Sequence, residues 1–93
     1  MKIIQSRSFE KKVKKFRKTE KKLLDKEIRQ IANKPDIGQE KKGDLRGVFV
    51  HKFKIHTLQY LLAYRFNIKT LEFIMIGPHE NYYRDLKSNI KSK

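Results

Sequence analysis

The spacing of the apolar residues changes once along this chain, and that change constrains the fold more than any other feature. Up to about residue 33 the apolar side chains recur every three or four positions, which is the period of an amphipathic helix. From Leu45 onward the period changes to two, which is the period of a strand with two different faces. Helices followed by consecutive strands predict an α+β fold with an antiparallel sheet.

The first third of the chain is predicted to form a helical hairpin behind a short opening strand at residues 2–5. Either Ser6 or Ser8 can cap the first helix. The apolar stripe of that helix consists of Phe9, Val13 and Phe16. Thr19 is the expected cap of a second helix, whose stripe spans residues 23–32 before a proline ends it. Because almost no linker separates the two helices, they should pack as a hairpin.

Three strands are predicted between residues 48 and 76. Alternation in the first strand places two sets of side chains on opposite faces: Phe49, His51, Phe53 and Ile55, and then Val48, Val50, Lys52 and Lys54. The second strand covers residues 60–66 and the third covers residues 71–76, after which Gly77-Pro78 is expected to turn the chain sharply. The hairpin should cover one face of the sheet, so the uncovered face is predicted to carry the chemistry. Residues from about 81 onward are expected to form a short basic helix or a frayed tail.

The chain carries a formal charge of +14 on 93 residues, and the excess is spread along its length. Residues 1–43 have a net charge of +9 and residues 44–93 a net charge of +5. Repulsion between this many positive charges destabilises a small folded domain, so the charge favours a polyanionic partner. RNA is the first choice among such partners. An acidic protein partner fits the same charge. With no cysteine and no zinc-like spacing of the three histidines, neither a disulfide nor a metal or other cofactor is expected.

The segment after the last strand concentrates side chains that can bind phosphate, stack on bases and move protons. A lone histidine is more often a surface residue than a catalyst, but the neighbours of His79 strengthen its case as a general acid or base. Tyr82 and Tyr83 are adjacent and therefore lie on different faces of any regular element. We expect Tyr82 to pack in the core and Tyr83 to be exposed, where it can stack on a base.

Basic side chains on the predicted sheet can supply the positive charge of such a site. Lys52 and Lys54 are two residues apart, so their ammonium groups project from the same face, although paired cations are also common at the rim of any sheet. His51 alternates with phenylalanines and is expected to be partly buried and hydrogen-bonded, whereas His56 lies at a turn. The candidates for binding substrate are Arg46, Arg65, Arg84 and Lys87.

Four short motifs, in their order and spacing, give the chain a resemblance to the RelE/ParE superfamily of bacterial toxins. They are Gly-Asp-Leu-Arg-Gly at residues 43–47, Lys52-Phe53-Lys54, Tyr-Leu-Leu-Ala-Tyr at residues 60–64 and the segment at residues 77–86. The resemblance covers nearly the whole chain and implies a single toxin domain, residues 1–93. That domain would have the microbial ribonuclease-type fold of RelE in the order β-α-α-β-β-β-(α).

The same resemblance implies a cytoplasmic toxin that a cognate antitoxin neutralises. RelE-like members cut messenger RNA in the ribosomal A site, by attack of a 2′-hydroxyl on the adjacent phosphate and without a metal. The antitoxin is expected to be acidic and partly disordered until it binds. Messenger RNA and the ribosome are the other expected partners. A membrane is not an expected partner, because no apolar run approaches the length of a membrane helix.

The resemblance also implies roles for individual residues. Lys52 and Lys54 match the strand lysines of RelE. His79 and Tyr83 match the Gly-x-His-x-x-x-aromatic pattern of the YafQ branch, in which the histidine is catalytic. The arginine that follows the central-strand tyrosine of RelE is replaced here by Leu61, and Arg65 on the same strand face is the candidate substitute. This departure favours a YafQ-like site built on the histidine.

Three functions are therefore open at this point. The first is a metal-independent endoribonuclease with Lys52, Lys54, His79 and Tyr83 as catalytic residues. The second is a ParE-like inhibitor of DNA gyrase, which acts through protein contact and needs no catalytic residue. The third is a non-catalytic RNA-binding module, which predicts binding with steep salt dependence and no cleavage.

Overall fold

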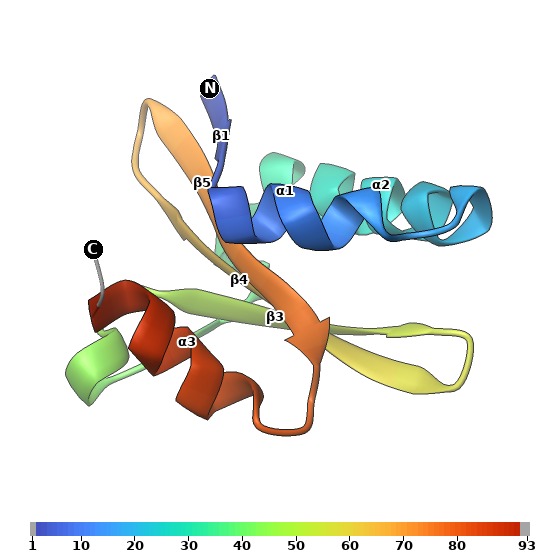
Figure 1. Cartoon of the computed structure of the whole chain (residues 1–93). Helices are drawn as coiled ribbons and strands as arrows, with labels where there is room; N and C mark the ends of the chain where they lie inside the picture. The colour runs from blue at the N-terminus through green and yellow to red at the C-terminus, as the bar shows by residue number, and fades with distance from the viewer. Residues whose placement is uncertain (1, 92–93) are drawn as a thin grey trace.

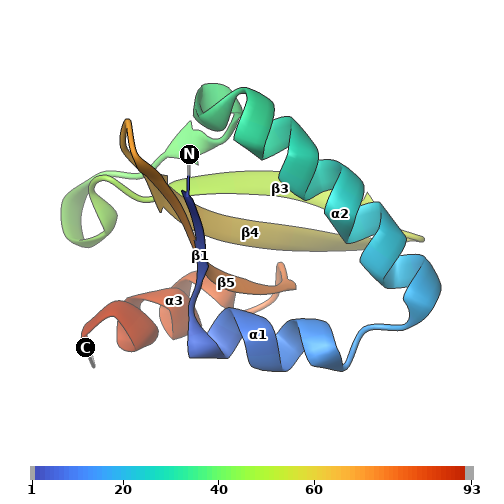
Figure 2. The ribbon, with the colours of Figure 1, turned by 90° about the horizontal axis from the view of Figure 1, so that it is seen from above.

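The chain folds around one five-stranded sheet with helices on both faces (Figures 1 and 2). The computed structural model describes the backbone of residues 2–91 and the side chains of residues 2–90. The strands are β1 (Lys2–Gln5), β2 (Gln39–Glu40), β3 (Phe49–Ile55), β4 (Leu58–Phe66) and β5 (Thr70–Pro78), in the spatial order β1-β5-β4-β3-β2. None of the helices within residues 2–91 has the length and apolar character that a membrane span requires.

The meander of three antiparallel strands predicted from the alternating pattern is confirmed in β3, β4 and β5. The sheet as a whole is mixed, because β1 pairs with β5 in the parallel direction. The chain leaves β1, crosses one face through two helices and returns to the far edge, so β1 lies beside the last strand. The two-residue strand β2 pairs with β3 in the antiparallel direction and forms the other edge of the sheet.

The helical hairpin consists of α1 (Arg7–Lys14) and α2 (Lys18–Asn33) and covers one face of the sheet. Ser6 caps α1, since its Oγ accepts the Phe9 N–H at 3.1 Å. The expected cap at Thr19 is wrong, because α2 already begins at Lys18. There the Arg17 N–H donates to Glu20 Oε1 at 2.7 Å. The cluster beneath the hairpin contains buried residues of both helices and of β3, β4 and β5.

The opposite face of the sheet is not uncovered, as we had expected from the sequence. Helix α3 (Tyr82–Lys91) lies across part of it, on the other side of the sheet from α1 and α2 (Figure 1). Tyr82 and Leu86 are one helical turn apart and both are buried, so they seal a second apolar cluster that includes Leu61 and Ala63. Only the part of this face beyond α3 remains open for chemistry.

The Gly77-Pro78 pair does not turn the chain as predicted but continues β5. Gly77 pairs with Leu61, and Pro78 pairs with Tyr60. A proline is tolerated here because β1 pairs with β5 only as far as Phe73, so that its missing N–H breaks no ladder on that side. The turn follows at residues 79–81, where Asn81 has a φ of 58°.

Candidate active site

A row of polar side chains crosses the three central strands where α3 no longer covers the sheet. Lys54 on β3 stands opposite Gln59 on β4. The His79 N–H donates to the Gln59 carbonyl at 3.2 Å, so His79 extends the ladder by one residue beyond β5. Directly opposed residues on one face have Cβ atoms about 4.5–5.5 Å apart. Lys54, Gln59 and His79 therefore form one continuous row.

A second row runs parallel to the first and marks where the apolar cluster begins. Lys52 stands opposite Leu61, which stands opposite Gly77. Lys52 is exposed and Leu61 is fully buried. The Tyr82 ring lies close to Gly77, since a Cβ on Gly77 would be 3.6 Å from it. We call the open surface formed by Lys52, Lys54, Gln59 and His79 the sheet-end patch; the first turn of α3 borders it.

Tyr82 and Tyr83 separate as expected, but Tyr83 is less exposed than predicted. Tyr82 is buried, and its hydroxyl donates to the Met75 carbonyl at 2.6 Å. Desolvation in the cluster raises the pKa of Tyr82 above its ordinary value, so the hydroxyl stays protonated. Tyr83 is half-buried against the same cluster, with Lys41 Nζ 4.9 Å from its ring centroid. The ammonium above the ring is a cation–π contact at the border of α3.

Arg65 does not join the sheet-end patch, which corrects its role as a substitute for the missing arginine. It shares the strand face of Leu61, but four residues along a strand span about 13 Å. Ala63, the residue between them on the same strand face, belongs to the cluster beneath α3. The Arg65 Nε also lies 3.3 Å from Glu72 Oε1, so the guanidinium forms an ion pair at the end of β4 away from the sheet-end patch.

The other three arginine and lysine candidates are exposed and lie around α3, outside the patch itself. Arg46 follows the 3-10 helix η2 (Gly43–Leu45) and forms an isolated bridge with Lys41. The Arg84 Nε lies 3.6 Å from Asp85 Oδ1, and its side chain is 76% exposed, so the carboxylate leaves it accessible. Lys87 lies one turn further along α3.

The remaining two histidines lie outside the sheet-end patch. The prediction for His51 is confirmed, because its Nε2 lies 2.7 Å from Glu27 Oε1 of α2 and its side chain is only 14% exposed. His56 has a φ of 57° at the β3–β4 turn, as its predicted turn position implies. Gln59 was not among the predicted site residues, because the strand was expected to begin at residue 60 and β4 begins at Leu58. The alternation that includes Leu61 would have placed Gln59 on the lysine face.

Comparisons with known proteins agree on one group. Residues 3–87 match the family model described as the ParE-like toxin of type II bacterial toxin-antitoxin systems. The fold is similar to a mutant of the E. coli toxin RelE in the free state, with a TM-score of 0.70, 18% identity and coverage of 98% of this chain and 95% of that one. It is also similar to a chain of the intact E. coli RelBE toxin-antitoxin complex, with a TM-score of 0.67, 20% identity and coverage of 85% and 96%. No curated protein matches the sequence.

Proposed function

Since the chain belongs to the ParE-like toxins of type II toxin-antitoxin systems, within the RelE/ParE superfamily, we propose that it is a metal-independent endoribonuclease that cuts messenger RNA on the ribosome. The observation that carries this proposal is the sheet-end patch. It places an exposed histidine and two exposed lysines on one open surface at the end of the central strands.

The reaction is attack of a ribose 2′-oxygen on the adjacent phosphorus, with breakage of the bond from phosphorus to the 5′-oxygen. It leaves a 2′,3′-cyclic phosphate and a 5′-hydroxyl. His79 takes the proton of the 2′-hydroxyl or gives one to the leaving 5′-oxygen. The pentacoordinate phosphorus carries an additional negative charge, which the ammonium groups of Lys52 and Lys54 stabilise. Neutral Gln59, between the two kinds of group, can both donate to phosphate oxygen and accept from a hydroxyl.

The border of the patch supplies surfaces for holding the strand. The exposed part of the Tyr83 ring can stack on a nucleobase, and stacking of this kind tolerates any base. Arg84 and Lys87 on α3 and Arg46 beside η2 add positive charge along the path that leads away from the patch. These contacts would position the backbone rather than read its sequence.

The proposal is tested by a cell-free translation reaction in which messenger cleavage is followed by primer extension. The His79→Ala variant should lose about 10²- to 10⁴-fold in cleavage rate, which is the usual contribution of one acid–base residue. The His56→Asn variant is the matched control, because His56 is an exposed histidine at a turn and Asn tolerates its positive φ. Full cleavage by the His79→Ala variant would remove His79 from the mechanism.

A second candidate is inhibition of DNA gyrase, which the placement of Arg65 favours. The position of the RelE arginine is occupied by buried Leu61, and Arg65 is paired with Glu72 away from the patch. A protein that acts by contact alone would not need an arginine there. This candidate would be favoured if the purified protein inhibits supercoiling by gyrase and does not cleave messenger RNA. The His79→Ala variant should then inhibit gyrase equally well.

A further inference from the structure

Most of the excess positive charge does not lie at the sheet-end patch. Residues 7–34, which form the helical hairpin and its ends, contain twelve basic and four acidic residues, a net of +8 out of the total of +14. All twelve basic side chains are exposed. The charge that suggested RNA from the sequence therefore belongs mainly to a different part of the molecule from the proposed chemistry.

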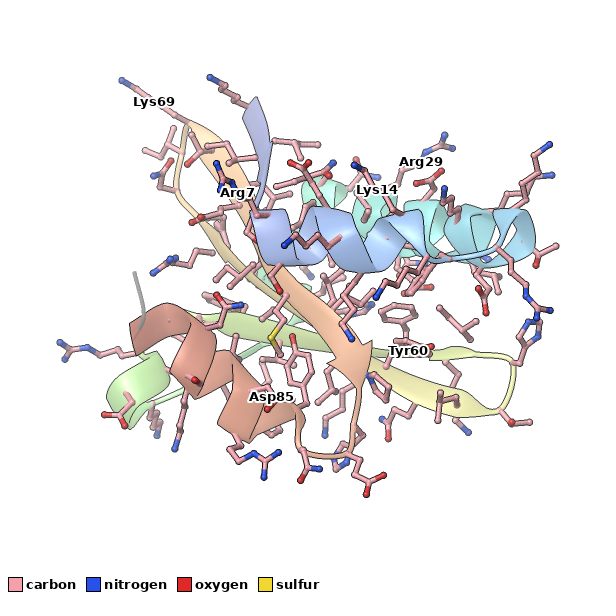
Figure 3. The ribbon with its side chains drawn as sticks, in the orientation of Figure 1. Arg7, Lys14, Arg29, Tyr60, Lys69 and Asp85 are labelled. Atoms are coloured by element: carbon pink, nitrogen blue, oxygen red, sulfur yellow. The ribbon has the colours of Figure 1, made fainter. Side chains whose placement is uncertain are left out.

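The hairpin and the sheet-end patch lie on opposite sides of the sheet. The patch shares its face with α3, whereas α1 and α2 cover the other face. Lys14 and Arg29 point away from the sheet on the outer side of the hairpin (Figure 3). A phosphate held at the patch is separated from these side chains by the thickness of the sheet and a helix layer. The hairpin cations must therefore serve another ligand, or a distant part of the same one.

The acidic residues of the hairpin compensate this charge only in part. Glu27 is bound to His51 on the inner side, and Glu20 accepts the Arg17 N–H at the start of α2. On the outer side of α2, Lys22, Lys26 and Arg29 follow at intervals of four and three residues and therefore form one stripe. They line a shallow hollow of about 410 Å³ together with Asp25, Gln30 and Asn33.

We propose that the outer surface of the helical hairpin binds the sugar–phosphate backbone of folded, double-helical RNA. Cations on flexible stems suit phosphates, which dominate the affinity of proteins for nucleic acid. A-form RNA is recognised mostly through its backbone and shape. Binding of a single strand relies on exposed aromatic side chains, and on this surface Phe9 is buried and Phe16 is half-buried beneath the hairpin.

The composition of the surface argues for RNA over an acidic protein. Protein interfaces have an apolar centre and are depleted in lysine. Nine of the twelve hairpin cations are lysines. Among the described residues 7–34, Leu23 is the one large hydrophobic side chain that is exposed. This inference does not depend on the proposed cleavage chemistry, since binding and cutting would occur on opposite faces.

The test measures binding of a blunt-ended RNA duplex and of a single-stranded oligoribonucleotide over a range of KCl concentrations. All proteins carry His79→Ala, so that the RNA is not cut. One variant adds Lys22→Ala, Lys26→Ala and Arg29→Ala. The matched control adds Lys2→Ala, Lys42→Ala and Lys69→Ala, which remove the same charge from exposed positions elsewhere, with Lys69 at the β4–β5 turn (Figure 3). Circular dichroism confirms that each variant is folded.

The hairpin variant should bind the duplex at least about tenfold more weakly at 0.1 M salt, and its log–log salt slope should fall by about 2 to 3, near one for each lost phosphate contact. The control variant and single-strand binding should change much less. An equal loss in both triple variants, or an unchanged duplex affinity, would overturn the proposal. A third result would also overturn the proposal: polyglutamate binds more tightly than the duplex at the same salt, and the hairpin variant loses this polyglutamate binding. The surface would then serve an acidic protein.

The outcome is distinguishable from that of the proposed function. If the hairpin variant loses duplex binding and the unsubstituted protein cleaves no messenger RNA, the proposed RNA-binding surface is supported and the proposed nuclease activity is rejected. If cleavage requires His79 and the hairpin variant binds the duplex with unchanged affinity, the proposed nuclease activity is supported and the proposed RNA-binding surface is rejected.

Discussion

His79 and Tyr82 stand three residues apart, and their environments give them opposite properties. Tyr82 is buried, donates its hydroxyl proton to the Met75 carbonyl and has a pKa raised by desolvation. His79 is exposed and contacts β4 through its backbone N–H. One residue can therefore anchor α3 while the other stays free to meet a ligand. Their sequence neighbourhood is the same, so burial separates a side chain that anchors the fold from one that is accessible to a ligand.

Removal of the Tyr82 hydroxyl should destabilise the protein by about 1–3 kcal/mol, because the Met75 carbonyl would be left buried without its donor. The Tyr82→Phe variant keeps the ring and so isolates this hydrogen bond. Urea unfolding measures the change, and the Tyr83→Phe variant serves as the control on a half-buried ring. A midpoint for Tyr82→Phe equal to that of the control would show that the bond contributes nothing.

A pH titration follows from the raised pKa values of Tyr82 and of Tyr64, which is also buried. Raised values mean that the folded protein holds these protons more tightly than the unfolded chain, whose tyrosines titrate near pH 10. This contribution to the free energy of unfolding is complete below about pH 10 and is lost as the pH rises above it. The difference in stability between wild type and Tyr82→Phe should therefore shrink above pH 10. A difference that grows there would contradict the assignment.

At the scale of elements, the alternating pattern predicted the three central strands, and a single irregularity changed which residues meet. Between Ala63 and Tyr64 the register of β4 against β5 shifts, and Ile74 has no partner on β4. Ile74 and Met75 both lie in the cluster beneath α3, while Ile76 lies in the cluster beneath the hairpin. Strict alternation would have put Ile74 and Ile76 on the same face. The bulge therefore places two consecutive residues of β5 in the same cluster.

The start of α1 depends on one of the two serines that the sequence offered as caps. Ser6 accepts the Phe9 N–H and also donates to the Ile74 carbonyl of β5, so it ties the helix to the sheet. Ser6→Ala should cost about 1–2 kcal/mol in thermal or urea unfolding, whereas Ser8→Ala should be nearly neutral. Equal effects of the two substitutions would mean that the cap is not the source of the stability.

At the scale of the whole molecule, charge opposes folding and predisposes the protein to bind a partner. A net charge of +14 is held within a radius of gyration of 12.4 Å, which is comparable to the Debye length of about 10 Å at 0.1 M salt. Repulsion between the exposed cations therefore acts across the entire protein at low salt. Partners that neutralise this charge, including the antitoxin expected for a type II toxin, should stabilise the fold by mass action.

The thermal midpoint should rise by about 5 °C or more when KCl is increased from about 0.01 M to about 0.15 M, which corresponds to about 1 kcal/mol for a domain of this size. The variant that lacks Lys22, Lys26 and Arg29 should have a higher thermal midpoint than the unsubstituted protein at low salt, and its midpoint should rise less as KCl is added. A midpoint that falls with salt would show that attractive ion pairs outweigh the repulsion.

The sequence by itself determined the helical hairpin, the three central strands and the faces of β3, because these follow from the local spacing of apolar residues. It also determined that Lys52 and Lys54 project from the same face of the sheet and that His51 is partly buried. Only the tertiary structure decided that α3 covers part of the second face, that Arg65 lies beyond that cover and that Gln59 lies between His79 and the lysines. These features depend on register and on packing between distant segments, which no local spacing specifies.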